Sequence, residues 1–280
     1  MSYKTVLVHL DNSKSCAGRV AVALDLAARF DAHLVGLVVT VEPVVPTFVM
    51  AQIPSSALES QREALRAKAD EAVVAFEAAA SKAGLSVETR RALAFNEEVP
   101  ETLALHARYA DLVVMGQHDP DDPNSLGAGT LEQCLLGAGR PVLVVPYIGA
   151  PEGFGRTVLL AWDASREAAR AASDALPLMA RADKVTVLTI NPKKGRAAHG
   201  EEPGADIALV IARHGVKAEA ESVTVRDVSI DEALLSRLSD NGADMLVMGC
   251  YGHARLRELV LGGTTRHILQ HMTVPTLMTH

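Results

Sequence analysis

Thr5-Val-Leu-Val-His-Leu-Asp11-Asn-Ser13 is the stretch that decides the fold, because the chain contains it twice. It returns in the second half as Thr157-Val-Leu-Leu-Ala-Trp-Asp163-Ala-Ser165. Each copy is a short apolar run, typical of a buried strand, that ends in an aspartate and a serine, which favour turns. A stretch that recurs in this way indicates an internal duplication.

Two further repeats follow in the same order in both halves. Ala110-Asp111-Leu-Val-Val-Met-Gly116 matches Ala243-Asp244-Met-Leu-Val-Met-Gly249, and Pro141-Val-Leu-Val-Val matches Pro275-Thr-Leu-Met-Thr. Three matches in one order predict two copies of a single domain type.

The chain has room for two such domains. Its 280 residues allow two domains of about 140 residues, each large enough to bury a core. The stretch from Ile148 to Gly155 contains glycine and proline and is typical of a linker. We therefore predict a first domain at residues 1–148 and a second at residues 156–280.

Short apolar runs alternate with helical patterns through both halves. In the first half we expect strands at residues 4–10, 33–40, 86–92, 111–115 and 141–145 and helices at 15–30, 57–83, 97–108 and 129–136. In the second half we expect strands at 156–162, 184–190, 217–225, 244–248 and 274–279 and helices at 166–180, 202–214, 230–240 and 263–271. Such alternation predicts right-handed crossovers and a parallel sheet with helices on both faces. The predicted fold class is α/β, with two tandem doubly wound domains that each contain a five-stranded parallel sheet.

The bulk composition excludes several classes of protein. The formal net charge of −7 argues against a nucleic-acid surface, which needs clustered lysine and arginine. No stretch approaches the roughly 18 apolar residues of a membrane span. Three cysteines, Cys16, Cys134 and Cys250, are too few and too scattered for a disulfide framework. We expect a cytoplasmic protein that binds neither nucleic acid nor membrane.

Several glycines follow a predicted strand of the second half. Ligands of open α/β sheets bind beyond the carboxyl ends of the strands, so these glycines lie where a ligand is expected. Gly249-Cys-Tyr-Gly252 leaves the strand end, and Gly262-Gly263-Thr264-Thr265 opens the last predicted helix. Glycine lets backbone N–H groups approach an anion, and a helix N-terminus adds free donors and partial positive charge. The hydroxyls of Thr264 and Thr265 could donate to the same anion. The pattern is compatible with a phosphate cradle or with an ordinary strand turn and helix entry.

The spacing Gly249-x2-Gly252-x9-Gly262 resembles the G-x2-G-x9-G-[ST] signature of ATP-binding universal stress proteins. Asp163-x-Ser165 after the first strand of the second half also looks like that family, and the resemblance spans both halves. It implies the adenine nucleotide alpha hydrolase-like fold. It also implies an ATP or ADP ligand, with or without Mg²⁺.

The family pattern assigns a role to each candidate site residue. The resemblance implies that Asp163 contacts the adenosine and that the backbone at Ile190 lines the adenine pocket. It implies that the phosphates and ribose lie against Gly249, Gly252, Gly262 and the residues that follow, Gly263, Thr264 and Thr265.

One departure from the signature weakens the predicted site. Gly263 stands where the family usually has serine or threonine, so one hydroxyl is lost. The backbone N–H remains and Thr264 follows directly. We expect lower affinity with the same cradle geometry.

The first half departs further from the signature. Gly116-Gln-His-Asp119 places a carboxylate where the second half has Gly252. A carboxylate at about 4 Å from a phosphate charge is repulsive by about 4 kcal/mol at an effective dielectric constant of about 20. Gly129-Thr130 remains before the last predicted helix as a relic of a cradle. We expect the first half to bind nucleotide weakly or not at all.

Other interpretations of the polar residues stay open. Asp11 and Asp163 could be helix N-caps, since aspartate suits that position. Cys250-x-x-His253 has a spacing found in metal sites, but no second ligand pair accompanies it, so we expect no metal site. The apolar segment from Val41 to Ser55 could cover the cleft, contact a partner or pack on its own domain.

Three functions fit these features. The leading hypothesis is a stress-response protein whose second domain binds an adenine nucleotide and so regulates binding to an unidentified protein partner. The second is a slow ATP hydrolase, although no catalytic residue or base is identifiable and hydrolysis should be weak at most. The third is a nucleotide-free scaffold.

The two halves should form an intramolecular pair that mimics the dimers of single-domain relatives, and a homodimer of whole chains could also form. In those relatives the last strand commonly pairs across the interface, so the resemblance implies that Pro141–Pro146 and Pro275–Thr279 pair here. Left unpaired, these apolar edges would invite aggregation.

Overall fold

The structure, a computed structural model, describes residues 2–42, 54–192, 202–252 and 263–280. The first half contains β1 (Thr5–Leu10), α1 (Cys16–Phe30), β2 (His33–Glu42), α3 (Ser55–Lys82), β3 (Val87–Phe95), the short helix η1 (Asn96–Glu98), α4 (Val99–Ala107), β4 (Leu112–Gly116), α5 (Ala128–Gly137) and β5 (Val142–Val145). The second half contains β6 (Thr157–Ala161), α6 (Arg166–Asp174), α7 (Leu176–Met179), β7 (Lys184–Ile190), α8 (Ala205–Ala212), β8 (Ala218–Val223), α9 (Ile230–Asp240), β9 (Met245–Gly249), α10 (Gly263–His271) and β10 (Thr276–Thr279).

All ten predicted strands are found, and one predicted helix is corrected. The helix expected at residues 166–180 is two helices, α6 and α7, which meet at Ala175. Pro177 lies at the start of α7, where a proline is tolerated. Proline has no N–H and cannot continue the hydrogen-bond ladder of α6, so the chain begins a new helix.

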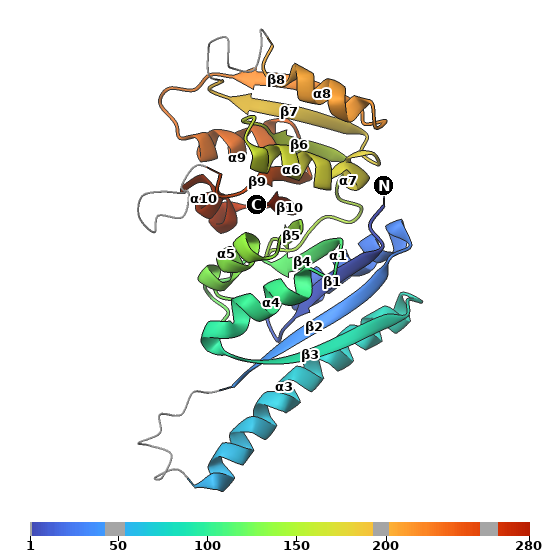
Figure 1. The fold of residues 1–280 in the computed structure, drawn as a ribbon, viewed down its shortest axis with the longest axis vertical. Coiled ribbons are helices and arrows are strands. Elements are labelled where there is room, and N and C mark those ends of the chain that lie inside the picture. The colour runs from blue at the N-terminus through green and yellow to red at the C-terminus, as the bar shows by residue number, and fades with distance from the viewer. Residues whose placement is uncertain (1, 43–53, 193–201, 253–262) are drawn as a thin grey trace.

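The strands of both halves form one continuous sheet, in the order β3-β2-β1-β4-β5-β10-β9-β6-β7-β8. Within each half all pairs are parallel, which confirms the α/β fold with parallel five-stranded halves. Figure 1 shows the two halves stacked along the long axis of the molecule, with β5 and β10 at the centre.

The two halves join through an antiparallel pair of strands, as the sequence predicted. β5 pairs with β10, and Leu143 lies opposite Leu277. These two leucines occupy equivalent positions in the repeat, so the halves are related by a pseudo-two-fold axis near this pair. Both side chains are fully buried. The pairing covers an edge that each half would otherwise expose.

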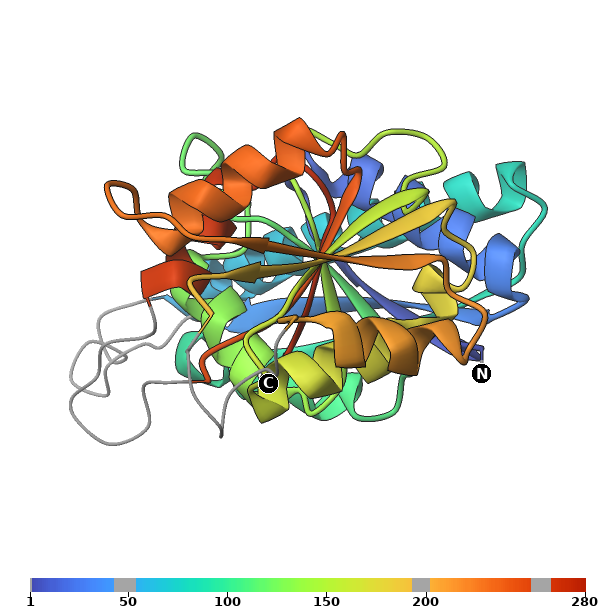
Figure 2. The same cartoon turned by 90° about the horizontal axis from the view of Figure 1, so that it is seen from above.

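Helices cover both faces of the sheet, because strand side chains point alternately to either side. Val6 and Val8 of β1 face a core beneath α1, α3, α6, α7 and α8, whereas Leu7 faces a second core beneath α4, α5, α9 and α10. Each core contains residues of both halves. Figure 2 shows the strands fanned out by the twist of the sheet, with helices on both sides.

The repeated aspartate has the same structural role in each half. Asp111 accepts hydrogen bonds from the backbone N–H groups of Lys4 and Thr5 at 2.7 and 3.0 Å. Asp244 does the same for Gly155 and Thr157, both at 3.0 Å. Each carboxylate thereby satisfies donors where the first strand of its domain begins.

No helix among the described residues combines the length and the apolar character needed to cross a bilayer.

Since β5 and β10 join the halves into one sheet, loss of packing in one half should destabilise both. Leu143→Ala should lower the free energy of unfolding by about 2–5 kcal/mol. Trp162, the single tryptophan of the chain, reports on the second half by fluorescence, and circular dichroism reports on both. Both probes should shift together in denaturant, whereas Leu209→Ala at an exposed site should shift neither. If the denaturation midpoint followed by Trp162 fluorescence were the same in Leu143→Ala as in the wild type, the two halves would not be coupled.

Candidate functional site

The candidate site lies where the strand order of the second half reverses. β6 pairs with β7 on one side and with β9 on the other, and the chain leaves β6 and β9 toward helices on opposite faces of the sheet. The crevice at such a switch point is where open α/β sheets bind ligands. Asp163, Ile190 and Gly249 all lie at this carboxyl edge, as predicted, because they follow or end β6, β7 and β9.

The turn after β6 is held by side chains that bond to backbone. The Asp163 Oδ1 atom accepts the N–H of Ser165 at 2.9 Å, and Ala164 between them has a φ of 58°. Ser165 caps α6, since its Oγ accepts the N–H of Ala168 at 3.1 Å. The N-cap interpretation of Asp163 is therefore wrong, because Ser165 is the N-cap and Asp163 lies two residues before it.

The loop after β9 packs closely on the first turn of α6. A Cβ atom at Gly249 would lie 2.5 Å from the carbonyl carbon of Glu167 and 2.6 Å from the nitrogen of Ala168. A Cβ atom at Gly252 would lie 2.9 Å from the Glu167 Oε2 atom. Gly249 needs glycine because backbone atoms of α6 already fill the space, whereas at Gly252 the neighbouring atoms belong to the end of the Glu167 side chain.

Glu167 is a site residue that the sequence did not single out. Its side chain is buried and pairs with the Nε atom of Arg166 at 2.5 Å. Burial raises the pKa of Glu167, but the hydrogen bond from Arg166 and nearby positive charge outweigh it, so the pKa lies below its ordinary value. The second-half site therefore contains a carboxylate too. An acidic residue in the first turn of a helix is too common to signal a site.

The start of α10 is joined to the glycine loop. The N–H of Tyr251, a residue with a φ of 60°, donates to the Thr265 Oγ1 atom at 3.4 Å. Thr265 is buried, while Thr264 is partly exposed and Gly263 exposed. Apart from its chain neighbours and the backbone of its own helix, no described atom lies within 4 Å of a Cβ built at Gly263, so a serine there would have room.

Some predicted features lie outside the described residues. These are Gly262, His253 of the cysteine–histidine spacing, and most of the segment from Val41 to Ser55. Among the residues that the structure does describe, no three or more His, Cys, Asp or Glu side chains are grouped so as to hold a metal ion.

In the first half the equivalent crevice is filled by an ion pair. The Arg19 Nη2 atom lies 2.8 Å from the Asp11 Oδ1 atom, and its Nε donates to the carbonyl of His9 at 2.8 Å. Arg19 is only 2% exposed, and its guanidinium occupies the space that a side chain at Gly116 would need. In the second half the residue that lies against the equivalent glycine, Gly249, is Glu167.

The loop after β4 reinforces this closure. Asp122 is buried and accepts the backbone N–H of Lys14 at 2.6 Å and that of Asn124 at 3.0 Å. The Asp119 carboxylate accepts the N–H of Asp121 at 3.0 Å. The expected obstacle, Asp119, thus caps a turn, while Arg19 fills the crevice itself.

His9 is buried beside this ion pair. Its Nδ1 atom lies 3.6 Å from the Asp11 Oδ2 atom and has no hydrogen-bond partner among the described residues. Burial lowers the pKa of His9 to about 4; Asp11 opposes this shift and Arg19 adds to it. The imidazole is therefore neutral at physiological pH.

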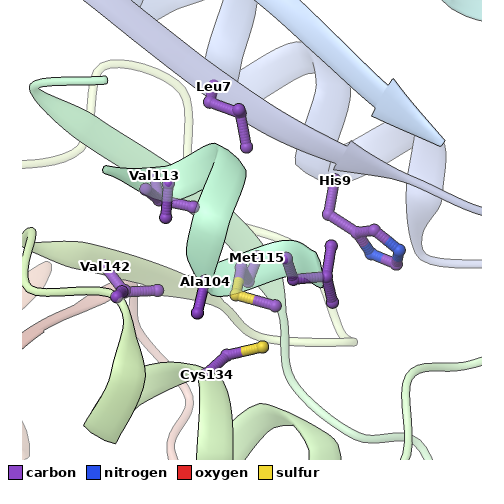
Figure 3. Close-up of a pocket in the computed structure, with 10 residues that line it drawn as sticks. Leu7, His9, Ala104, Val113, Met115, Cys134 and Val142 are labelled. Atoms are coloured by element: carbon purple, nitrogen blue, oxygen red, sulfur yellow. The ribbon is translucent and has the colours of Figure 1, made fainter. Parts of the chain in front are cut away.

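An apolar cavity lies beside His9, under α4 and α5 (Figure 3). Leu7, Val113, Met115 and Cys134 are among the residues that line it. Its volume of about 10 Å³ is far below the roughly 300 Å³ of a small-molecule pocket. The cavity is a packing gap in the core.

Comparisons with known proteins agree with this architecture. A model described as the universal stress protein family matches residues 2–146 and again residues 155–280. A curated universal stress protein of Synechocystis is 37% identical over 68 residues, which are 24% of this chain and 23% of that protein. The chain thus aligns with about a quarter of the length of this relative.

The first of two similar solved structures shows the same fold. A universal stress protein of Archaeoglobus fulgidus has a TM-score of 0.74 and 15% identity, with 98% of this chain and 95% of the other covered. A universal stress protein solved in complex with cAMP has 22% identity and a TM-score of 0.34, with 52% of this chain and 99% of the other covered.

The neutral, buried His9 makes stability depend on pH. Its folded pKa lies below the ordinary value of about 6.5, so the unfolded chain binds more protons as the pH falls through that value. His9 should therefore remove about 1.5 kcal/mol of stability between about pH 6.5 and 5. Denaturant titrations of His9→Leu should show a flatter dependence on pH in this window. An unchanged slope in the variant would rule out His9 as its source.

Proposed function

The chain belongs to the universal stress protein family, with two domains of that family in tandem, and on this premise we propose that it is a nucleotide-dependent binding module of the stress response. The second half holds one adenine nucleotide, ATP or ADP, at the carboxyl ends of β6, β7 and β9. The first half holds none. Nucleotide occupancy then alters which protein partner the chain binds.

The close approach of the glycine loop to α6 is the observation that carries this proposal. Gly249 touches the backbone of α6 so tightly that no other residue fits. Neither Gly249 nor Gly252 carries a side chain, so an anion could approach the backbone closely at these two positions. The N–H groups of Cys250 and Tyr251 between them are already bonded, to Thr279 and Thr265. The N-termini of α6 and α10 lie at the same edge of the sheet and favour negative charge.

The candidate residues divide between the parts of a nucleotide. In the proposal Asp163 contacts the adenosine and the Ile190 backbone lines the pocket of the base. The phosphates lie against Gly249, Gly252, Gly262, Gly263 and Thr264. Thr265 is buried and bonded to the N–H of Tyr251, so we assign it to holding the loop rather than to binding phosphate directly.

Mg²⁺ fits the charge balance of this site. The carboxylate of Glu167 faces Gly252, and it would repel a bare polyphosphate by several kcal/mol at short range. A divalent cation prefers carboxylate and phosphate oxygens and would offset this repulsion. Glu167 and Asp163 are the described residues that would hold it.

Glu167 also favours a second candidate function, slow ATP hydrolysis, because it is a charged carboxylate beside the proposed phosphates. Hydrolysis needs an oriented water and differential binding of the transition state. Glu167 is held by Arg166 and its pKa lies below the ordinary value, which makes it a weak base. We therefore propose that nucleotide is held and released rather than turned over.

Nucleotide binding should depend on Gly252. Gly252→Asp should abolish nucleotide binding, because the aspartate side chain would crowd the Glu167 carboxylate and add a second negative charge beside the phosphates. Calorimetry with Mg²⁺-ATP measures this, and thermal denaturation checks that the variant is folded. The wild-type protein should bind one nucleotide per chain.

Asp119→Gly is the matched control for this experiment. It restores the glycine signature in the first half, but it should create no second site because Arg19 still fills that crevice. Unchanged affinity in folded Gly252→Asp, or two equivalent sites in the wild type, would contradict the assignment.

Turnover should be negligible. Steady-state phosphate release with Mg²⁺-ATP should stay near background, far below the ~1–100 s⁻¹ of kinases, and Glu167→Gln should not change it. Release that is well above background and is lost in Glu167→Gln would establish the enzyme instead.

A further inference from the structure

A bidentate ion pair joins the two halves beside the candidate site. The Nε and Nη2 atoms of Arg266, on α10, lie 3.0 and 3.1 Å from the two carboxylate oxygens of Glu132, on α5. Glu132 is only 4% exposed. Paired hydrogen bonds of this kind fix both distance and orientation. Arg266 lies in the first turn of α10, directly after the cradle residue Thr265.

The two partners occupy equivalent positions in the repeat. Gly129-Thr130-Leu-Glu132 opens α5 as Gly263-Thr264-Thr-Arg266 opens α10. A pseudo-two-fold axis brings equivalent positions together, as it does for the central residues of β5 and β10. Two identical halves would place like charges here. The opposite charges are therefore specific to the pairing of a first half with a second half.

The other end of α10 is held by the first half as well. The Nε2 atom of Gln117, just after β4, donates to the carbonyls of Leu269 and Gln270 at 2.9 and 3.2 Å. Its Oε1 accepts the N–H of Tyr147 at 3.1 Å. Gln117 is 2% exposed, and both ends of its amide are bonded. It thereby satisfies carbonyls that the end of a helix leaves without partners.

The helix that these contacts hold, α10, is itself bonded to the glycine loop. The N–H of Tyr251 donates to Thr265, the neighbour of Arg266. The Tyr251 hydroxyl is buried without a hydrogen-bond partner among the described residues. Burial raises the pKa of Tyr251, and Glu132 raises it further, so the Glu132 carboxylate acts electrostatically on the loop as well as on α10.

We propose that Glu132 and Gln117 of the first half are positioning residues that fix α10 and so hold the phosphate cradle of the second half in its binding geometry. The proposal rests on the proposed nucleotide site. α10 spans only nine residues, and an isolated helix of that length is unstable in water. If α10 is already held in place, it loses less conformational entropy when a ligand binds. The affinity of the site for that ligand is therefore higher.

Charge reversal tests the proposal in the full chain. Glu132→Arg places two arginines together and should lower the affinity for Mg²⁺-ATP about tenfold. The double variant Glu132→Arg, Arg266→Glu restores opposite charges and should recover most of the loss. Glu132→Gln keeps the shape and should show a smaller loss, and Glu101→Arg, at an exposed position on α4, should show none.

Hydrogen exchange of α10 without nucleotide gives a second, independent measure. Amides of α10 should exchange faster in Glu132→Arg and in Gln117→Ala, and the charge-swapped double variant should restore their protection. If the wild-type protein binds no nucleotide, the proposed function is wrong. Hydrogen exchange would still show whether the first half holds α10 in place. Unchanged exchange and affinity in Glu132→Arg and Glu132→Gln would overturn the proposal, as would a loss that the charge swap does not rescue.

Discussion

The antiparallel pairing of β5 with β10 is the constraint on which the rest of the structure depends. Each half ends in a short apolar strand that would be an exposed edge in isolation. Pairing the two edges makes one ten-stranded sheet and two cores that run through both halves. The same pairing sets α5 and α10 on one face near the axis, where Glu132 meets Arg266.

Duplication has let the two halves diverge on one scaffold. Both keep the strand order and the aspartate that follows the first strand, Asp11 or Asp163. In the first half Arg19 from α1 fills the crevice and neutralises Asp11. In the second half the residue that faces the strand-end glycine is Glu167, and it borders the crevice together with Gly249 and Gly252.

The repeat and its periodicity were sufficient to predict the strands and the α/β class, because buried strands and amphipathic helices have distinct sequence periods. The pairing of the last strands was expected from the resemblance to single-domain relatives that form dimers. The site was only partly predictable. Gly249 and Gly252 follow a recognisable spacing, but Glu167 looks like an ordinary first-turn acid. Arg19 looks like a surface arginine until the fold shows it buried on Gly116. Contacts across the crevice depend on tertiary structure, and local patterns do not encode them.

Photo-crosslinking tests the central claim most directly, that the second half alone offers a nucleotide site. The purified chain is labelled with 8-azido-ATP in the presence of Mg²⁺, digested and mapped by mass spectrometry, with excess ATP as competitor. The account predicts competed label only in second-half peptides from the carboxyl edge, near Asp163, Ile190 or Gly249. Competed label near Asp11 or Gly116, in the first half, would contradict it.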